Sequence, residues 1–275
     1  MKTFRLLISL LFAVFSGLAV FWINSSGKPG GEYSESYKER EKEKIDRLFA
    51  VPILLYHNID GKGPFSVTSE QLREHFRLIR ESGVDIVPLR DLVSRIESRT
   101  PYRRKSAVIT FDDGYKSMYD KLLPIAKEFG YPMTLFVYID FVHPTSKNLI
   151  SWDEIRALER AGIDVESHTY SHADLTKILS SDSPDSFRKL FKEMYLSRRI
   201  ISLETGNDCE FIAFPYGNYN SYLVNMARLA GYKRAFTTEY GMNPVTRDNF
   251  CLRRHHIKSS YSAKQILSIL NQSVP

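Results

Sequence analysis

The sequence predicts an α/β barrel, in which parallel strands alternate with helices around a single core. Strand-like and helical segments alternate from residue 51 almost to the end of the 275-residue chain, which is the pattern of repeated βα units. With 43% hydrophobic residues, the chain can fill one large core, and a single α/β barrel commonly occupies about 200–250 residues. Each cluster of chemistry-bearing residues directly follows a strand-like run, and α/β barrels keep their active sites at the carboxyl ends of their strands.

The expected strands are short runs of apolar and aromatic residues that are bounded by turn-forming residues. The run Ala107–Phe111, for example, has Thr110 as its only polar member, which is typical of a strand buried on both faces. In chain order the expected strands cover residues 51–56, 84–87, 107–111, 132–137, 163–167, 211–214 and 232–236.

The expected helices are identified mainly by their ends. Thr68 and Ser151 each precede Gln or Glu by three residues, which is the pattern of a capping box at a helix start. Gly83, Gly130 and Gly162 follow the last helical residues, because glycine readily adopts the left-handed conformation that ends a helix. In chain order the expected helices cover residues 68–83, 89–98, 115–129, 151–162, about 184–203, 221–230 and a terminal segment from 262.

Two adjacent carboxylates, Asp112 and Asp113, directly follow the strand expected at 107–111. Adjacent side chains diverge along a strand, but where the backbone turns at its end both can face one pocket. Such a pair raises its own pKa values unless a positive group lies beside it. A divalent metal is the usual group, with one aspartate as ligand and the other free as a base. An Asp-Asp-Gly turn that merely ends the strand is the structural alternative.

His168 and His172 follow the strand expected at 163–167. They are four residues apart, which is one helical turn, so both imidazoles can reach one ion. With Asp113 they predict a three-ligand site that leaves a position open for water, as in catalytic zinc sites. The same donors also accept cobalt, nickel or manganese, so Zn²⁺ is the first expectation among four metals.

A third cluster, Pro215-Tyr216-Gly217, follows the strand expected at 211–214. Proline restricts the backbone here, and glycine permits a close approach by a neighbouring chain or a ligand. Such a turn can direct the Tyr216 N–H at an oxyanion and line a substrate site with Pro215 and Tyr216. An ordinary Pro-Tyr-Gly turn is the alternative.

These clusters resemble the motifs of the NodB-homology polysaccharide deacetylases, carbohydrate esterase family 4, which read T-F-D-D-G, H-[ST]-x-x-H and P-Y-G. The run Val51–His57 also looks like the first strand of extracellular members, so the resemblance covers roughly residues 50 to 260. It implies an irregular (β/α)7 barrel and metal-dependent removal of N-acetyl groups from a polysaccharide. Carried over by position, it makes Asp112 the catalytic base and Asp113, His168 and His172 the metal ligands.

The sequence departs from the family pattern at position 213. Many members have an arginine there that orients the catalytic aspartate, whereas this chain has Ala213. Members that act on poly-N-acetylglucosamine commonly lack that arginine. The resemblance therefore favours poly-β-1,6-N-acetylglucosamine as the substrate, with peptidoglycan or chitooligosaccharide as alternatives.

The family's general acid, a histidine in a late L-x-H motif, has no clear counterpart. The nearest segment is Cys251–Ile257, in which His255 or His256 can protonate the leaving amine. Two readings of this segment stay open beside that one. Arg254 can act as the partner of a carboxylate, or the whole segment can be a basic surface patch.

Two further residues are candidates for substrate binding. Trp152 resembles a family tryptophan that lines the site, and it can equally be a residue at a helix start that packs on the barrel. His57, at the end of the first expected strand, can line the substrate groove or serve the structure alone.

The N-terminal segment is separate from the catalytic domain. Residues 6–23 carry no charge and follow Lys2 and Arg5, so residues 1–23 are expected to be a membrane anchor or a signal sequence. Either one exports the rest of the chain. Residues 24–47 are expected to form a flexible, charged linker, as a solvated helix or a disordered spacer, and residues 48–275 the catalytic domain.

Composition constrains the partners. The formal net charge of +6 comes without a recognisable nucleic-acid-binding module, so basic clusters are interpreted as solvated surface. Cys209 and Cys251 can form a disulfide in an exported chain, but their spacing in the sequence does not decide this.

Two other functions stay open. One is a cyclic-amide hydrolase, which the expected export disfavours. The other is a non-catalytic sugar-binding module, which a free base beside a metal disfavours because binding alone does not require such a base.

Overall fold

The computed structural model describes residues 35–143, 149–181 and 183–272. Residues 44–275 form one compact unit. The helix α2 (Glu35–Leu48) lies largely within the range expected to be a linker. Asp46 at its end is buried and accepts a hydrogen bond from Arg247 Nε at 2.5 Å, so the last residues of that range pack within this compact unit.

The expected N-terminal segment, residues 1–23, lies outside the described residues. Within the described ranges, every helix is too short or too polar to cross a bilayer.

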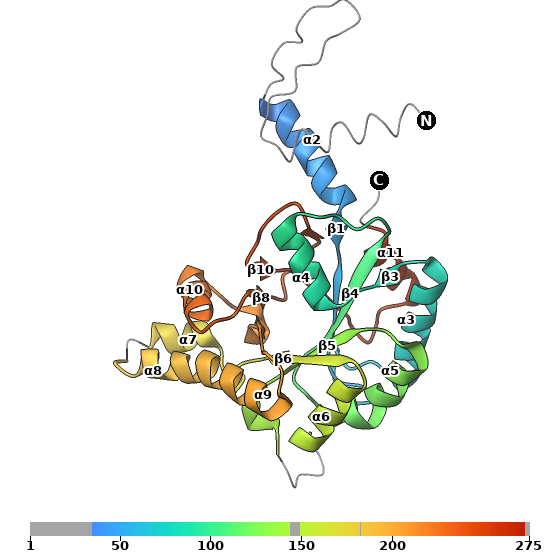
Figure 1. Ribbon diagram of the computed structural model, residues 1–275. Helices are drawn as coiled ribbons and strands as arrows, with labels where there is room; N and C mark the ends of the chain where they lie inside the picture. The colour runs from blue at the N-terminus through green and yellow to red at the C-terminus, as the bar shows by residue number, and fades with distance from the viewer. Residues whose placement is uncertain (1–34, 144–148, 182, 273–275) are drawn as a thin grey trace, which may run out of the picture. The chain divides into compact units, whose positions relative to one another are not determined.

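The main sheet is parallel and curls into a distorted barrel (Figure 1). Its strand order is β10-β8-β7-β6-β5-β4-β2-β11. The two edge strands, β10 (Cys251–Leu252) and β11 (His255–His256), are consecutive pieces of one short segment. One piece pairs with β8 and the other with β2, so residues 251–256 join the two edges of the sheet. The strands between them are β2 (Ile53–Tyr56), β4 (Ser106–Phe111), β5 (Met133–Val137), β6 (Ile163–Ser167), β7 (Phe211–Ala213) and β8 (Arg234–Phe236).

The first two expected strands differ from the observed ones. Proline cannot donate to a strand ladder, and Pro52 divides the first run into β2 and β1 (Ala50–Val51), which pairs antiparallel with β9 (Asn243–Pro244). The second strand, β3 (Asp85–Ile86), pairs only with the start of β4. It therefore extends the end of one barrel strand and lies off the path of the barrel.

Helices surround the sheet on its outer side, as Figure 1 shows for α3, α5, α6 and α9. Both expected capping boxes, at Thr68 and Ser151, are present. Gly83 and Gly130 end their helices in the left-handed conformation. The helices are α3 (Ser69–Ser82), α4 (Leu89–Ser98), η1 (Met118–Leu122), α5 (Leu123–Phe129), η2 (Ile139–Phe141), α6 (Trp152–Arg160), α7 (Leu175–Ser180), α8 (Ser186–Phe191), η3 (Lys192–Leu196), α9 (Ser197–Thr205), η4 (Pro215–Gly217), α10 (Ser221–Leu229) and α11 (Ala263–Leu270).

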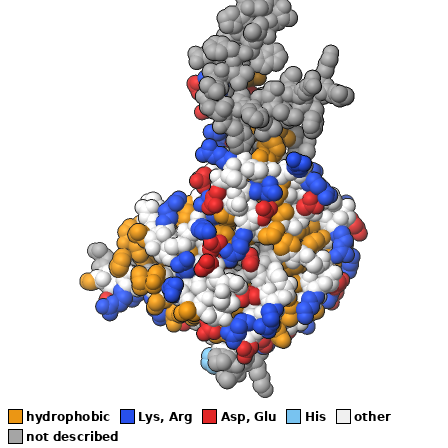
Figure 2. Space-filling view, viewed as in Figure 1, with side chains coloured by type: hydrophobic (Ala, Val, Ile, Leu, Met, Phe, Trp, Pro, Cys, Tyr) orange, Lys and Arg blue, Asp and Glu red, His pale blue; other side chains and the backbone are white. Residues whose placement is uncertain are grey.

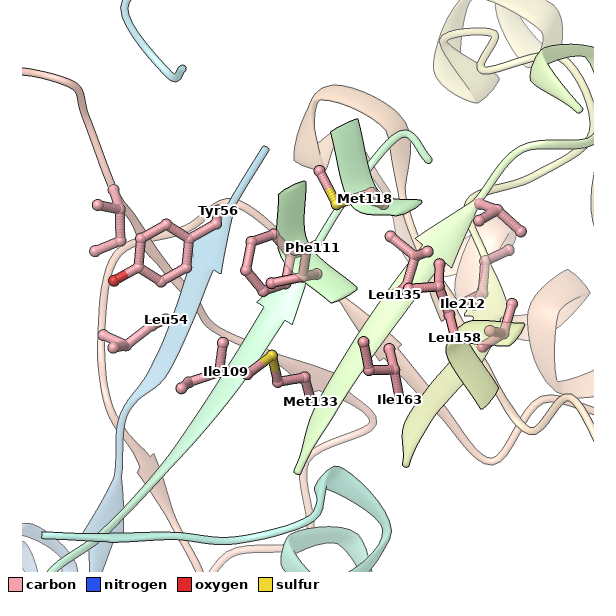
Figure 3. Close-up of a cluster of buried hydrophobic side chains, with 14 of the residues drawn as sticks. Leu54, Tyr56, Ile109, Phe111, Met118, Met133, Leu135, Leu158, Ile163 and Ile212 are labelled. Atoms are coloured by element: carbon pink, nitrogen blue, oxygen red, sulfur yellow. The ribbon is translucent and has the colours of Figure 1, made fainter. Parts of the chain in front are cut away.

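Strand alternation divides the core into two layers. Leu54 and Ile109 point outward into the layer between sheet and helices, part of which is drawn in Figure 3. Ile53 and Val108 point into the barrel, where Phe136 joins them. The same alternation sends Thr110 and then Asp112 toward the barrel interior, so the predicted base lies at the carboxyl end of the inner layer.

The surface carries charges of both signs. On the face shown in Figure 2, Lys and Arg side chains are interspersed with Asp and Glu. This mixture fits the interpretation of the basic clusters as solvated surface.

Candidate active site

The two adjacent aspartates follow β4 in a strained turn. Asp113 and Gly114 both have positive φ, 76° and 79°, a conformation that non-glycine residues rarely adopt. Because the backbone turns at Asp113, the side chains of Asp112 and Asp113 face one site. In a continuing strand they would point to opposite faces of the sheet. A side chain at Gly114 would place its Cβ 2.9 Å from Val137 Cγ1, so the turn also requires glycine.

Asp113, His168 and His172 come together as predicted. Asp113 Oδ1 lies 3.5 Å from His168 Nε2 and 3.4 Å from His172 Nε2. The three ligand atoms all lie within 4.8 Å of one another. Tetrahedral metal bonds of about 2.1 Å separate neighbouring ligand atoms by roughly 3.4 Å, so the spacing of this triad fits a bound divalent metal.

The environment of His168 also fits a metal ligand. Its Nδ1 lies 2.8 Å from the carbonyl oxygen of Ala213, which leaves Nε2 directed at Asp113. In metal-binding histidines, a hydrogen bond from the ring nitrogen that does not bind the metal fixes the ring orientation and the tautomer. Burial alone would lower the pKa of His168, but Asp112 and Asp113 outweigh it and raise the pKa above its ordinary value.

The loop that carries His172 is not helical, contrary to the reasoning from its spacing. Thr169 and His172 have φ values of 72° and 60°, so left-handed residues bring the imidazoles together instead of a helical turn. The buried carboxylate of Glu193, in η3, holds this loop. It accepts hydrogen bonds from the N–H groups of Tyr170 and Ser171 at 3.0 and 2.9 Å and from the Ser171 hydroxyl at 2.6 Å.

Glu193 is a buried partner of the site loop that sequence reasoning missed. It lies 21 residues beyond His172 in an ordinary helical stretch, and no local pattern distinguishes it from a surface glutamate.

Asp112 has a dedicated cationic partner. Arg254 Nη1 and Nη2 each donate to one carboxylate oxygen of Asp112 at 2.7 Å, and Arg254 Nε donates to the carbonyl of Thr237 at 2.9 Å. Burial would raise the pKa of Asp112, but the charges of Arg254 and His168 outweigh burial and lower it. Asp112 is therefore an ionised, oriented carboxylate beside the triad, and Arg254 is the carboxylate partner that one reading of the sequence allowed.

His57 and His256 lie beside this carboxylate in a cluster of three rings. The His57 and His256 centroids are 4.5 Å apart, Phe65 stacks on His256 at 3.7 Å, and Phe65 also lies 5.8 Å from His57. Burial lowers the pKa of His57 below its ordinary value, and the charges of Asp112 and Asp113 oppose that shift without reversing it. Burial and the neighbouring His57 lower the pKa of His256 to about 4. Within the described residues, the buried His57 Nδ1 and His256 Nε2 have no hydrogen-bond partner.

His255 lies apart from these groups. Alternation along the segment turns Arg254 and His256 toward the site and His255 to the opposite face, where it packs edge-on against Tyr240 with ring centroids 4.2 Å apart. Burial lowers its pKa to about 4. Of the two histidines expected as general acid, the structure thus brings only His256 near Asp112.

The remaining candidates occupy different surroundings. Tyr216 lies in the turn η4 with φ of 60°, and its ring packs edge-on against His172 with centroids 4.9 Å apart. Pro215 beside it is buried. Trp152 begins α6 and packs against the core between sheet and helices, which is the structural role weighed for it. Cys209 and Cys251 are both free thiols.

Comparison with known proteins agrees with this geometry. Residues 99–235 match the family model for polysaccharide deacetylases. The chain belongs to this family. Polysaccharide deacetylases of the carbohydrate esterase 4 type are metal-dependent hydrolases, and the Asp-His-His triad required for that chemistry is present. The predicted family, barrel and enzyme class are therefore confirmed.

Similar polysaccharide deacetylases come from several bacteria. The chain is 26% identical over 221 residues to YxkH of Bacillus subtilis, covering 79% of this chain and 74% of that protein. It is 22% identical over 242 residues to a poly-β-1,6-N-acetyl-D-glucosamine N-deacetylase of Staphylococcus epidermidis, covering 80% and 83%.

Two solved structures share the fold. The deacetylase PplD of Streptococcus pyogenes, in complex with acetate, superposes with a TM-score of 0.72 at 22% identity, over 81% of this chain and 98% of that one. IcaB from Ammonifex degensii superposes with a TM-score of 0.70 at 19% identity, over 82% and 97%.

Proposed function

We propose that this polysaccharide N-deacetylase releases acetate from poly-β-1,6-N-acetylglucosamine. The observation that carries the chemistry is an ionised carboxylate, Asp112, held by Arg254 beside the triad of Asp113, His168 and His172. Relatives named for the β-1,6 polymer support the choice of substrate, as does Ala213 in place of the family arginine.

Asp113, His168 and His172 would hold a divalent metal, with Zn²⁺ the first choice, and it would supply Lewis-acid chemistry that lowers the pKa of the attacking water and polarises the acetyl carbonyl. Asp112 accepts the proton of that water, because its lowered pKa keeps it ionised at neutral pH. The Tyr216 N–H donates to the oxyanion that develops on the carbonyl oxygen.

We assign proton delivery to His57. Its imidazole interacts with both aspartates, whereas of the two aspartates only Asp112 acts on His256 in the same way, and His255 faces away. Protonated His57 gives its proton to the departing glucosamine nitrogen and is left as the neutral imidazole, the form that its lowered pKa favours, and His256 positions the His57 ring.

The test is acetate release by the purified full-length protein on β-1,6 poly-N-acetylglucosamine, chitooligosaccharide and peptidoglycan, each with and without added zinc. Metal-dependent release confined to the β-1,6 polymer is the expected result. Release only from another polymer keeps the chemistry and replaces the substrate. No release from any polymer by protein with bound metal contradicts the enzyme and favours a sugar-binding module.

We also propose that the catalytic unit acts outside the cytoplasm, attached to the membrane or released from it. The support is the uncharged run at 6–23 behind Lys2 and Arg5. Protease added to intact cells should digest the catalytic unit if it is anchored outside. Full protection in spheroplasts, with digestion only after their membrane is lysed, would contradict export.

A further inference from the structure

We propose that a groove at the amino end of the barrel binds the headgroups of an anionic phospholipid membrane. The groove is lined by residues 48–51 and 102–106, and no step of the proposed reaction uses it. Such binding goes beyond the proposed function, because it fixes which end of the catalytic unit faces the membrane.

The groove lies between two segments that precede barrel strands. Residues 50–51 form β1, ahead of β2, and residues 102–106 lead into β4; β1 and the start of β4 lie side by side (Figure 1). The Pro52 carbonyl accepts a hydrogen bond from the Val108 N–H at 3.0 Å, and before these residues the two segments line a cavity of about 210 Å³. The catalytic groups follow β4 and β6, so the groove and the active site lie at opposite ends of the barrel.

One wall of the groove is cationic. Arg103, Arg104 and Lys105 are consecutive and exposed. Arg104 Nη1 lies 3.2 Å from Asp85 Oδ1, whereas Lys105 Nζ donates to the neutral side-chain amide of Asn271 at 3.1 Å. Among the residues that the structure describes, the Arg103 side chain has neither an ion pair nor a hydrogen bond. Only one of the three positive charges therefore has an acidic partner.

The other surfaces of the groove are largely apolar. Leu48 is 37% exposed, Phe49 is partly exposed, and the Tyr102 ring lies between these residues and the cations along the groove lining. The Arg95 guanidinium lies 4.2 Å from the Tyr102 ring centroid, and the Tyr102 hydroxyl donates to Asp91 at 2.8 Å, so this ring is held in place. The cavity is smaller than the roughly 300–1,000 Å³ of pockets that enclose a drug-sized ligand, and it can take a headgroup only.

An anionic phospholipid matches both kinds of surface. Its phosphate suits the three cations, each of which strengthens binding to an anionic membrane about fivefold, while its glycerol and first acyl carbons suit Leu48 and Phe49. The position of the groove in the chain favours a membrane over a soluble anion. Only residues 24–47 separate Leu48 from the uncharged run at 6–23, so the membrane expected there is within reach. Docking at this end leaves the catalytic end free for the polymer.

The test is hydrogen–deuterium exchange of the full-length protein with excess nanodiscs, made either of phosphatidylglycerol or of phosphatidylcholine. The backbone at 101–105 is irregular, so its amides exchange rapidly unless a membrane covers them. Arg103→Glu combined with Lys105→Glu reverses the charge of the groove.

The matched control is Arg188→Glu combined with Lys189→Glu. This exposed pair on α8 adjoins Phe187, which is 59% exposed, so it belongs to another surface of basic and apolar residues. The two double variants change the net charge equally and differ only in place.

We expect the wild-type amides at 102–105 to exchange about tenfold more slowly with phosphatidylglycerol than with phosphatidylcholine. The groove variant should lose this protection and the α8 variant should keep it. High salt should also weaken it, because the headgroup contacts are electrostatic. Both variants should release acetate from soluble polymer at the wild-type rate, since neither pair lies near the triad.

Equal exchange of 102–105 with the two lipids overturns the inference, as does protection at 186–191 in place of 102–105, which would place the membrane on α8. The same protection by soluble glycerol phosphate would make the groove a site for small anions and also overturns membrane docking. All three results leave the deacetylase function standing. Absence of metal-dependent acetate release contradicts that function alone.

Discussion

Arg254 holds Asp112 through two parallel hydrogen bonds of 2.7 Å, and both side chains are buried. Arg254 lies between β10 and β11, so the segment that joins the two edges of the sheet also orients the carboxylate. Position 213, where many family members have an orienting arginine, holds Ala213, whose carbonyl instead binds His168. An arginine from a different segment of the chain thus lies beside Asp112.

Replacing Arg254 should move the acid limit of activity to higher pH. The pKa of Asp112 is lowered in the folded protein by Arg254 and His168. Without the guanidinium, burial raises that pKa, and a protonated Asp112 cannot accept a proton. For Arg254→Met we expect kcat/KM at neutral pH to fall roughly a hundredfold or more, and the acid limb of the pH profile to shift upward.

The matched control is Arg253→Met, because Arg253 is partly exposed and pairs with Glu239 at 3.5 Å. Its profile should stay at the wild-type position. Removing one partner of a buried ion pair costs about 3–5 kcal/mol, so circular dichroism must show that Arg254→Met is folded at the assay temperature. A folded variant with an unshifted acid limb would show that Arg254 does not set the pKa of Asp112.

Asp112→Asn should abolish turnover and leave the metal bound. Asparagine keeps the shape of the side chain but cannot accept the proton of the attacking water, a step that contributes about 10²–10⁴-fold. His172→Ala should instead lose the metal, because it removes one of three ligands. Metal content after dialysis, measured beside acetate release, separates the two. Wild-type turnover by Asp112→Asn would disprove its assignment as base.

Dialysis against a chelator provides the corresponding test on the wild-type protein. Removal of the metal should stop acetate release, and added Zn²⁺ should restore it, because the triad residues themselves are unchanged. Undiminished activity in protein shown to be free of metal would contradict the predicted metal dependence.

The site residues that could be predicted from the sequence are those grouped in short motifs along the chain. Asp112, Asp113, His168 and His172 sit in compact motifs at strand ends, and strand ends of one sheet meet at one edge. Their convergence followed from that topology alone. The spacing of the two histidines was interpreted wrongly as a helical turn, because two left-handed residues are invisible in the sequence.

Groups supplied by tertiary packing could not be predicted in the same way. The strands β10 and β11 have two residues each, too few for any periodicity, so neither the joining of the sheet edges nor the inward direction of Arg254 was readable. Glu193 reaches the site from a helix whose sequence shows only that it is partly buried. The ring stack of Phe65 on His256 likewise depends on a loop and a strand that are far apart in the chain.

Glu193→Gln should weaken metal binding without removing a ligand. The Glu193 carboxylate accepts three hydrogen bonds from the loop that carries His172. In glutamine, one oxygen can still accept from both N–H groups and the NH2 group faces the Ser171 hydroxyl, but the negative charge that strengthens these bonds is lost. Loss of such supporting groups typically costs about 10–100-fold in metal affinity. Titration of the apo-protein with Zn²⁺ measures this directly. Glu204→Gln on α9, whose carboxylate pairs with Arg156 at the surface, should retain wild-type affinity; equal affinities in both variants would assign Glu193 to the fold alone.

Gly217→Ala should impair catalysis more than stability, and Gly130→Ala is its matched control. Both glycines have positive φ, 74° and 68°, but a Cβ on Gly217 would lie 2.6 Å from the backbone nitrogen of Thr238, whereas one on Gly130 meets no atom within 4 Å. Both variants therefore share the backbone strain of about 1 kcal/mol, and only Gly217→Ala must displace the turn that carries the Tyr216 N–H.

Because one oxyanion donor contributes about 10²–10³-fold to kcat, we expect a loss approaching that size for Gly217→Ala and near wild-type kcat for Gly130→Ala. Parallel kinetic and urea-unfolding measurements distinguish the two effects. Equal kcat values in the two variants would mean that the turn at Tyr216 does not serve the oxyanion.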